Sequence, residues 1–153
     1  MNLAAEADFR LGDETDTARL GAAIGDALRI GEAVCLSGPL GAGKSTLARG
    51  LIRRLAGAEI EAPSPTFTLV QTYETARLSV SHFDLYRLNS PDEVFELGFE
   101  EALDAGAAVI EWPDRLGRHL PVDRLDVALR FDGAARRAHL TPHGAWEERP
   151  LEF

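Results

Sequence analysis

The sequence has 153 residues and a mass of 16.6 kDa, which is close to the length of one ordinary domain. Hydrophobic residues make up 45% of it and charged residues 27%. These values are typical of globular proteins and exclude a disordered, collagen-like or membrane-spanning description of the whole chain. The formal net charge of −9 opposes direct, tight binding of a nucleic-acid backbone over most of the surface. The single cysteine, Cys35, excludes an intramolecular disulfide.

Helix and strand signals alternate along the chain. Strands are expected over residues 5–11, 33–36, 67–73, 78–86, 107–110, 125–131 and 137–141. Helices are expected from Asp13 to Gly31, from about Ser45 to Gly57, after the capping box Ser90-Pro91-Asp92-Glu93, and over residues 99–103. The order indicates one α/β domain over residues 1–153, with a largely parallel core sheet and an antiparallel hairpin at its edge. The polar tail from Pro142 is expected to be loose.

No apolar run approaches the roughly 18 residues of a membrane-spanning helix, and the N-terminus lacks the charged-then-apolar pattern of a signal peptide. We therefore expect a cytoplasmic protein with no membrane partner.

One segment matches the phosphate-binding pattern G-x-x-x-x-G-K-[ST]. It reads Gly38-Pro39-Leu40-Gly41-Ala42-Gly43-Lys44-Ser45. A buried strand precedes it and an amphipathic helix follows, as this loop requires. The glycines let successive N–H groups line an anion nest, and the helix dipole points at the same phosphates. Lys44 is then positioned for the β- and γ-phosphates, and the Ser45 hydroxyl can ligate Mg²⁺.

Two acidic residues end expected strands on the far side of this loop. Asp84 lies near the end of the alternating segment 78–86, and Glu111 directly follows the apolar run 107–110. Because ligands of open α/β sheets bind beyond the carboxyl ends of the strands, either carboxylate can hold Mg²⁺ or orient water. Lys44 is the only lysine in the chain, so the Asn-Lys-x-Asp motif that recognises guanine is missing, which favours ATP over GTP.

Five motifs follow one another in a specific order. They read Thr17-Ala18-Arg19-Leu20-Gly21, Gly41-Ala42-Gly43-Lys44-Ser45-Thr46, Ser64-Pro65-Thr66-Phe67, His82-Phe83-Asp84-Leu85-Tyr86-Arg87 and Glu111-Trp112-Pro113. With these motifs the sequence resembles the TsaE family (formerly YjeE), the small ATPase of tRNA threonylcarbamoyladenosine synthesis, over nearly the whole chain. The resemblance implies a P-loop NTPase fold, a three-layer α/β/α sandwich. It also implies ATP binding and hydrolysis with Mg²⁺ beside TsaB- and TsaD-type subunits. The TsaD-type subunit transfers a threonylcarbamoyl group to adenosine 37 of tRNA, which the ATPase meets only through the complex.

The resemblance also implies roles for individual residues of this sequence. It implies Lys44, Asp84 and Glu111 as catalytic residues, and Ser45, Asp84 and Glu111 as metal ligands, with the division of labour between the two acids left open. The nucleotide-binding residues it implies are Glu14, Thr17, Gly38, Pro39, Leu40, Gly41, Ala42, Gly43, Lys44, Ser45, Thr46, Thr66, Trp112 and Arg136. His82 is expected to orient Asp84 or to pack, and Arg87 to pair with a carboxylate or to serve a partner or phosphate.

Two positions depart from the family pattern. Pro39 stands where an aspartate is common, and Ala134 stands where the family often has an arginine after the hairpin glycine, so that Arg136 or Arg137 would have to substitute. No arginine finger is evident, so we expect a weak ATPase that a partner stimulates. A small-molecule kinase and a non-catalytic ATP-dependent interaction module remain as alternatives.

Overall fold

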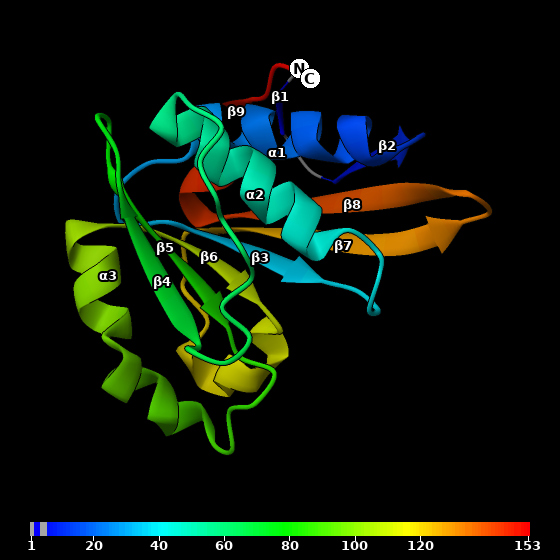
Figure 1. The fold of residues 1–153 in the computed structure, drawn as a ribbon. Coiled ribbons are helices and arrows are strands. Elements are labelled where there is room, and N and C mark those ends of the chain that lie inside the picture. Colours follow the sequence, from blue (N-terminus) through cyan, green and yellow to red (C-terminus); the bar gives the residue numbers. More distant parts are fainter. Residues whose placement is uncertain (1, 4–5) are drawn as a thin grey trace.

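The fold is built on a seven-stranded sheet, seen in the computed structural model, which describes residues 2–3 and 6–153 (Figure 1). The order across the sheet is β2-β8-β7-β3-β6-β5-β4. The strands are β2 (Ala7–Leu11), β3 (Ala33–Ser37), β4 (Val70–Glu74), β5 (Ser79–Asp84), β6 (Gly106–Glu111), β7 (Arg124–Asp132) and β8 (Ala135–His143). Residue 5 of the first expected strand lies outside the described residues.

Most strands of this sheet run in one direction, as the sequence predicts. The pairs β3–β6, β3–β7 and β5–β6 are parallel, whereas β4 and β8 run against their neighbours. The predicted hairpin β7–β8 lies toward one side of the sheet, and β2 adds outside it by antiparallel pairing with β8. Strand β2 therefore covers hydrogen-bonding groups that the hairpin would otherwise expose.

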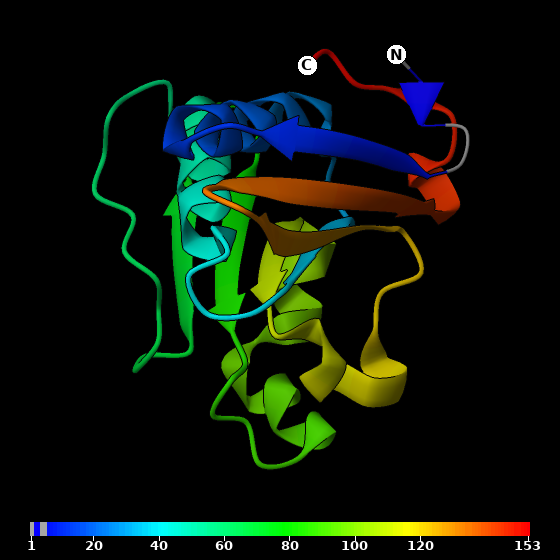
Figure 2. The same ribbon diagram turned by 90° about the vertical axis from the view of Figure 1, so that its right-hand side faces the viewer.

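Helices cover both faces of the sheet and produce three layers (Figure 2). The helices α1 (Glu14–Ala27) and α2 (Lys44–Ala56) lie on one face, and η1 (Pro91–Leu97), α3 (Phe99–Ala105) and η2 (Pro113–His119) lie on the other. Within β3, Val34 and Leu36 join the first core while Ala33 and Cys35 join the second. This burial on both sides explains why the strand appears in the sequence as an unbroken apolar run.

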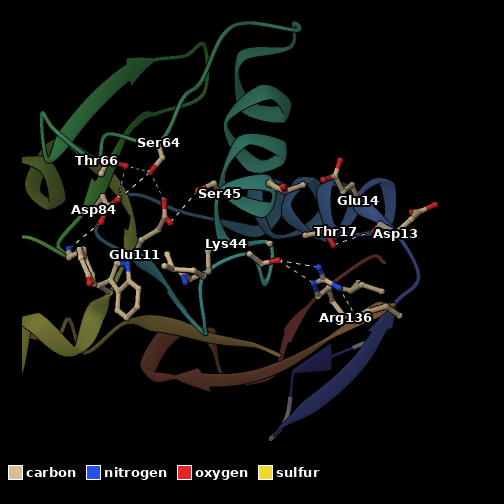
Figure 3. A pocket seen from close by; sticks show the side chains of 18 of the residues that line it. Asp13, Glu14, Thr17, Lys44, Ser45, Ser64, Thr66, Asp84, Glu111 and Arg136 are labelled. Carbon is tan, nitrogen blue, oxygen red and sulfur yellow. Dashed lines mark hydrogen bonds between the residues drawn. The ribbon is translucent and has the colours of Figure 1, made fainter. Parts of the chain in front are cut away.

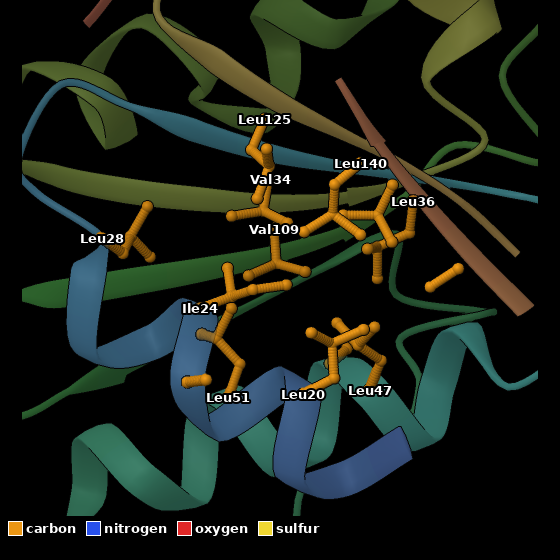
Figure 4. Packing of buried hydrophobic residues seen from close by; sticks show 14 of the residues in the cluster. Leu20, Ile24, Leu28, Val34, Leu36, Leu47, Leu51, Val109, Leu125 and Leu140 are labelled. Carbon is orange, nitrogen blue, oxygen red and sulfur yellow. The ribbon is translucent and has the colours of Figure 1, made fainter. Parts of the chain in front are cut away.

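The two long helices approach each other so closely that glycine is required between them. A Cβ on Gly21 would lie 2.1 Å from the Leu47 carbonyl oxygen, and one on Gly50 would lie 2.4 Å from the Ala18 carbonyl oxygen. Beside these contacts, Leu20, Ile24, Leu47 and Leu51 fill the core beneath the helices (Figure 4). The packing fixes the position of α2, and with it the loop that leads into this helix.

Several local expectations differ from the structure. Helix α1 ends at Ala27 and not at Gly31, and the Leu28 N–H donates to the Gly25 carbonyl at 3.3 Å. The segment after Ser90 is a 3-10 helix, in which the Ser90 side chain makes no capping bond and its carbonyl accepts from the Glu93 N–H at 3.2 Å instead. The strand expected over 67–73 begins only at Val70, because residues 67–69 form a turn closed by the Leu69 N–H donating to the Pro65 carbonyl at 2.7 Å.

The prediction of a loose tail from Pro142 is wrong. After β8 the chain forms the short 3-10 helix η3 (Gly144–Trp146) and the strand β9 (Arg149–Pro150), which pairs with β1 (Asn2–Leu3). Trp146 is fully buried, and buried Arg149 forms a two-bonded ion pair with buried Glu32, with 2.6 Å between Nη2 and Oε2. The buried tryptophan and an ion pair between residues far apart in the sequence fix the position of this otherwise polar segment. None of the helices in the described part of the chain has the length and apolarity that crossing a bilayer requires.

Candidate nucleotide-binding site

The phosphate loop lies between the end of β3 and the start of α2, as its motif predicts. Gly38, Gly41 and Gly43 all have positive φ, and a Cβ on Gly38 would meet the Leu129 carbonyl oxygen at 2.3 Å. Position 38 therefore accepts only glycine, both for its backbone angle and for the neighbouring strand β7. Helix α2 then starts at Lys44, so its N-terminal N–H groups and dipole point into the loop.

A cavity of about 670 Å³ opens beside this loop. Its walls come from the start of α1, the phosphate loop, the segment before β4, the ends of β5 and β6, and the tip of the β7–β8 hairpin (Figure 3). The lining residues are Leu11, Gly12, Asp13, Glu14, Thr17, Leu40, Gly41, Gly43, Lys44, Ser45, Thr46, Ser64, Thr66, Asp84, Tyr86, Glu111, Trp112, Ala134, Ala135 and Arg136.

The two predicted carboxylates stand side by side in this cavity. Asp84 and Glu111 are register partners on the parallel strands β5 and β6, and both are buried. The Ser45 hydroxyl donates to Glu111 Oε1 at 3.4 Å, which joins the phosphate-loop helix to β6. Ser64 lies 3.3 Å from an oxygen of each carboxylate, and Thr66 lies 3.4 Å from Asp84 Oδ2. The segment before β4 is thus tied to both acids through hydroxyl groups (Figure 3).

One sequence prediction was that His82 orients Asp84. In the structure His82 contacts Glu111 instead. Its Nε2 lies 2.7 Å from Oε2 of Glu111, and both side chains are buried. The reason is the order of the strands: β6 lies beside β5, so the imidazole reaches across to the neighbouring strand. Asp84 instead accepts from the Tyr86 N–H at 3.1 Å.

Lys44 is held inside its own loop. The Nζ group donates to the backbone carbonyls of Gly38 and Pro39, the second at 3.2 Å, and it stands 4.6 Å from the centre of the Trp112 ring. Burial lowers the pKa of Lys44, while the nearby carboxylates of Glu111 and Asp84 act in the opposite direction. The ammonium can exchange its carbonyl partners for phosphate oxygens because Lys44 itself lines the cavity.

Trp112 enters the site through an unusual backbone conformation. Its φ of 59° and ψ of 53° place a non-glycine residue in the left-handed region, which costs of order 1–3 kcal/mol and is typical of functional segments. The turn presents the indole to Lys44 and packs it against Tyr86, with 4.9 Å between ring centres.

Most of the residues expected to bind nucleotide lie together in the cavity. Gly38, Pro39 and Ala42 do not line it, since Pro39 is exposed on the outer side of the loop and Ala42 is fully buried beneath it. At the hairpin, Arg136 reaches the Gly41 carbonyl at 3.2 Å, whereas Arg137 pairs with Asp132 at 3.2 Å. Of the two arginines considered as substitutes at position 134, only Arg136 therefore faces the phosphate loop.

Sequence reasoning left several lining residues out, namely Leu11, Gly12, Asp13, Ser64, Tyr86, Ala134 and Ala135. Asp13 caps α1 by accepting from the Asp16 N–H at 3.0 Å, and its position between a strand and a helix was a usable signal. Ser64 belongs to a motif quoted above, but nothing in the sequence indicated that it bridges both acids. Arg87, for which a carboxylate partner was considered, instead stacks on Phe67 at 4.7 Å from the ring centre.

The donor set of this site suits Mg²⁺. Mg²⁺ prefers oxygen ligands and is usually held by one or two carboxylates together with substrate phosphates, not by an all-protein cage. Ser45, Glu111 and Asp84 offer one hydroxyl and two carboxylates next to the phosphate loop. In the part of the chain that the structure describes, no group of three or more His, Cys, Asp or Glu residues forms a ready-made metal site.

Fold and loop together define a P-loop NTPase-type protein. A model of the family "Threonylcarbamoyl adenosine biosynthesis protein TsaE" matches residues 11–139, and the chain therefore belongs to the TsaE family. Among relatives named tRNA threonylcarbamoyladenosine biosynthesis protein TsaE, the protein of Rickettsia felis is 40% identical over 78% of this chain and 70% of its own length. That of Rickettsia bellii is 38% identical over 86% and 92%.

A solved structure agrees with the family assignment. The crystal structure of Bacillus subtilis YdiB superposes with a TM-score of 0.74 at 25% sequence identity, covering 91% of this chain and 86% of that one. The resemblance read from the five motifs is thereby confirmed at the level of family and fold.

Proposed function

We propose that this chain binds ATP with Mg²⁺ in the cavity and hydrolyses it to support threonylcarbamoyl transfer to adenosine 37 of tRNA. It would do so in a cytoplasmic complex with TsaB- and TsaD-type subunits, and would meet the tRNA only through them. The observation that carries the proposal is the 3.4 Å contact between the Ser45 hydroxyl and Glu111 at the mouth of the phosphate loop. It joins a phosphate-loop hydroxyl to a strand-end carboxylate, the pair that holds the metal in P-loop enzymes. The names of the relatives support the biological role.

The proposed roles follow from the contacts of each side chain. Lys44 and the loop N–H groups would bind the β- and γ-phosphates, and Ser45 with Glu111 would hold Mg²⁺. The bound metal supplies charge neutralisation on the phosphate oxygens. Asp84 makes no bond to Ser45 but accepts from Ser64 and Thr66, so we assign it to the attacking water. That water would add to the γ-phosphorus as the bond to the ADP oxygen breaks, and its proton would pass to a carboxylate.

The remaining lining residues would surround the nucleoside. Glu14 and Thr17 lie at the start of α1 (Figure 3) and line the cavity together with Trp112. Arg136 lines the cavity, but its guanidinium is bonded to Gly41 and stacked 4.5 Å from the centre of the Phe131 ring. An arginine held in this way is not poised over a γ-phosphate, which supports the expectation that a partner must complete the site for fast turnover.

The test is phosphate release by the purified chain, measured alone and with TsaB- and TsaD-type subunits. We expect slow release alone and faster release in the mixture, and an absence of stimulation would count against the role in this complex. Glu111→Gln should retain ATP binding and lose turnover. Phosphorylation of an added small-molecule acceptor, in place of free phosphate, would favour a kinase. Full complex function with Glu111→Gln would favour a non-catalytic module.

A further inference from the structure

We infer that His82 is the positioning residue of Glu111: its imidazole holds one carboxylate oxygen so that the other stays turned toward the phosphate loop. The inference rests on the proposed ATP hydrolysis and deepens it. Its first support is the contact itself, 2.7 Å between Nε2 and Oε2, made by side chains that are only 1% and 4% exposed. Hydrogen bonds to an ionised acceptor at such a distance are among the strong ones.

The second ring nitrogen indicates which tautomer is present. Nδ1 of His82 is buried and has no hydrogen-bond partner among the described residues. A proton on Nδ1 would bury an unsatisfied donor, whereas a lone pair there costs less. The structure therefore assigns the proton to Nε2, where it is donated to Glu111.

The two carboxylate oxygens of Glu111 have different partners. Oε2 lies 2.7 Å from His82 Nε2 and 3.3 Å from the Ser64 hydroxyl, whereas Oε1 accepts from the Ser45 hydroxyl at 3.4 Å. Oε1 is therefore the oxygen on the side of the phosphate loop. Ser64 alone cannot hold this orientation, because its hydroxyl is shared with Asp84 at 3.3 Å and lies on a segment outside the sheet.

The strand around His82 shows why a purely space-filling role does not account for it. Two residues earlier on the same face of β5, Val80 is fully buried in the core beneath α1 and α2. The register partner of His82 on β6 is Val109, which belongs to the same core. An apolar residue would suit these neighbours, yet the position carries a polar ring that reaches across to Glu111 on β6. Ligand carboxylates are commonly oriented by such a partner, and its loss typically costs about 10–100-fold in activity or affinity.

A matched pair of substitutions tests the inference. His82→Gln places an amide N–H near the position of Nε2, whereas His82→Asn keeps a polar side chain of similar burial but withdraws that donor. We expect His82→Asn to lower kcat by about 10-fold or more, with KM and the Kd for ATP within about twofold of the unchanged protein. His82→Gln should recover most of the lost turnover. Equal turnover of His82→Asn and the unchanged protein, or equal impairment of both variants, would overturn the inference.

A second measurement does not depend on activity. In the unchanged protein, NMR of isotope-labelled histidine should show His82 protonated on Nε2 and protected from exchange, and Glu111→Gln should shift this signal. A proton on Nδ1, or a signal indifferent to Glu111→Gln, would refute the inference even if both variants fold poorly. A protein that shows the expected signal but hydrolyses no ATP, alone or with its partners, would contradict the proposed function and leave the pairing of His82 with Glu111 standing.

Discussion

Replacing Gly21 by Ala should destabilise this protein by about 2 kcal/mol, although alanine is the better helix former. The new Cβ would lie 2.1 Å from the Leu47 carbonyl oxygen, where ordinary contacts begin at 3.4 Å. Helices α1 and α2 must then separate, and even a gap of ~0.5–1 Å forfeits a quarter to a half of each contact energy across the interface. Overpacking of this kind costs up to about 3 kcal/mol, and alanine's helix preference returns about 1 kcal/mol.

Urea unfolding followed by far-UV circular dichroism measures this change, and the melting temperature should fall by about 4–8 °C. Gly25→Ala is the matched control on the same helix, because its Cβ would lie 3.1 Å from the Leu51 carbonyl oxygen and needs only a small adjustment. We expect its stability to stay within about 1 kcal/mol of the unchanged protein. If Gly21→Ala were as stable as the unchanged protein, or less harmful than Gly25→Ala, the helix-contact argument would be refuted.

Further predictions concern single side chains. Lys44→Ala should weaken ATP binding at least tenfold by titration calorimetry, and unchanged affinity would contradict the phosphate-loop assignment. Because burial lowers the pKa of Lys44, this amine should lose its proton, and so be acylated, at a lower pH than an ordinary lysine. Peptide mapping should show ATP protecting it. Arg149→Ala should cost about 3–5 kcal/mol in urea unfolding, since Glu32 is left buried without its partner. Burial raises the pKa of the Cys35 thiol, so a thiol reagent should label it only as the protein unfolds, and rapid labelling of the folded protein would contradict its burial.

The phosphate loop was predictable because several local signals agree there. The apolar run before Gly38, the glycine spacing and the amphipathic helix after Lys44 each indicate the same strand–loop–helix unit. The acids Asp84 and Glu111 were also predictable, because strand ends in an open α/β sheet gather at one edge. Their register pairing on β5 and β6 agrees with that rule.

Features that depend on distant neighbours were not predictable. Alternation along β5 assigns His82 to a face but cannot say whether β6 lies beside it, so its pairing with Glu111 was missed. Ser64 lies in a segment without periodicity, and its bonds to both acids exist only once the sheet has formed. Arg149 is held by Glu32, 117 positions away in sequence, so the composition of the tail gave a misleading indication of disorder.

The pairing of β1 with β9 brings the two ends of the chain side by side (Figure 1). The β1–β9 pair lies near the start of β2 and beyond the end of β8, whereas the cavity is lined by the opposite ends of these strands, at Leu11 and Arg136. The last residue, Phe153, folds back onto Phe9, with 5.2 Å between the ring centres. A short linker could therefore join the ends in a circular permutant, as adjacent termini commonly allow. A fluorescent label, a surface anchor or a fused protein attached at the N-terminal end, before β1, would stand about a strand's length from the cavity. The N-terminal end thus offers an attachment point for following this protein in a complex without obstructing its site.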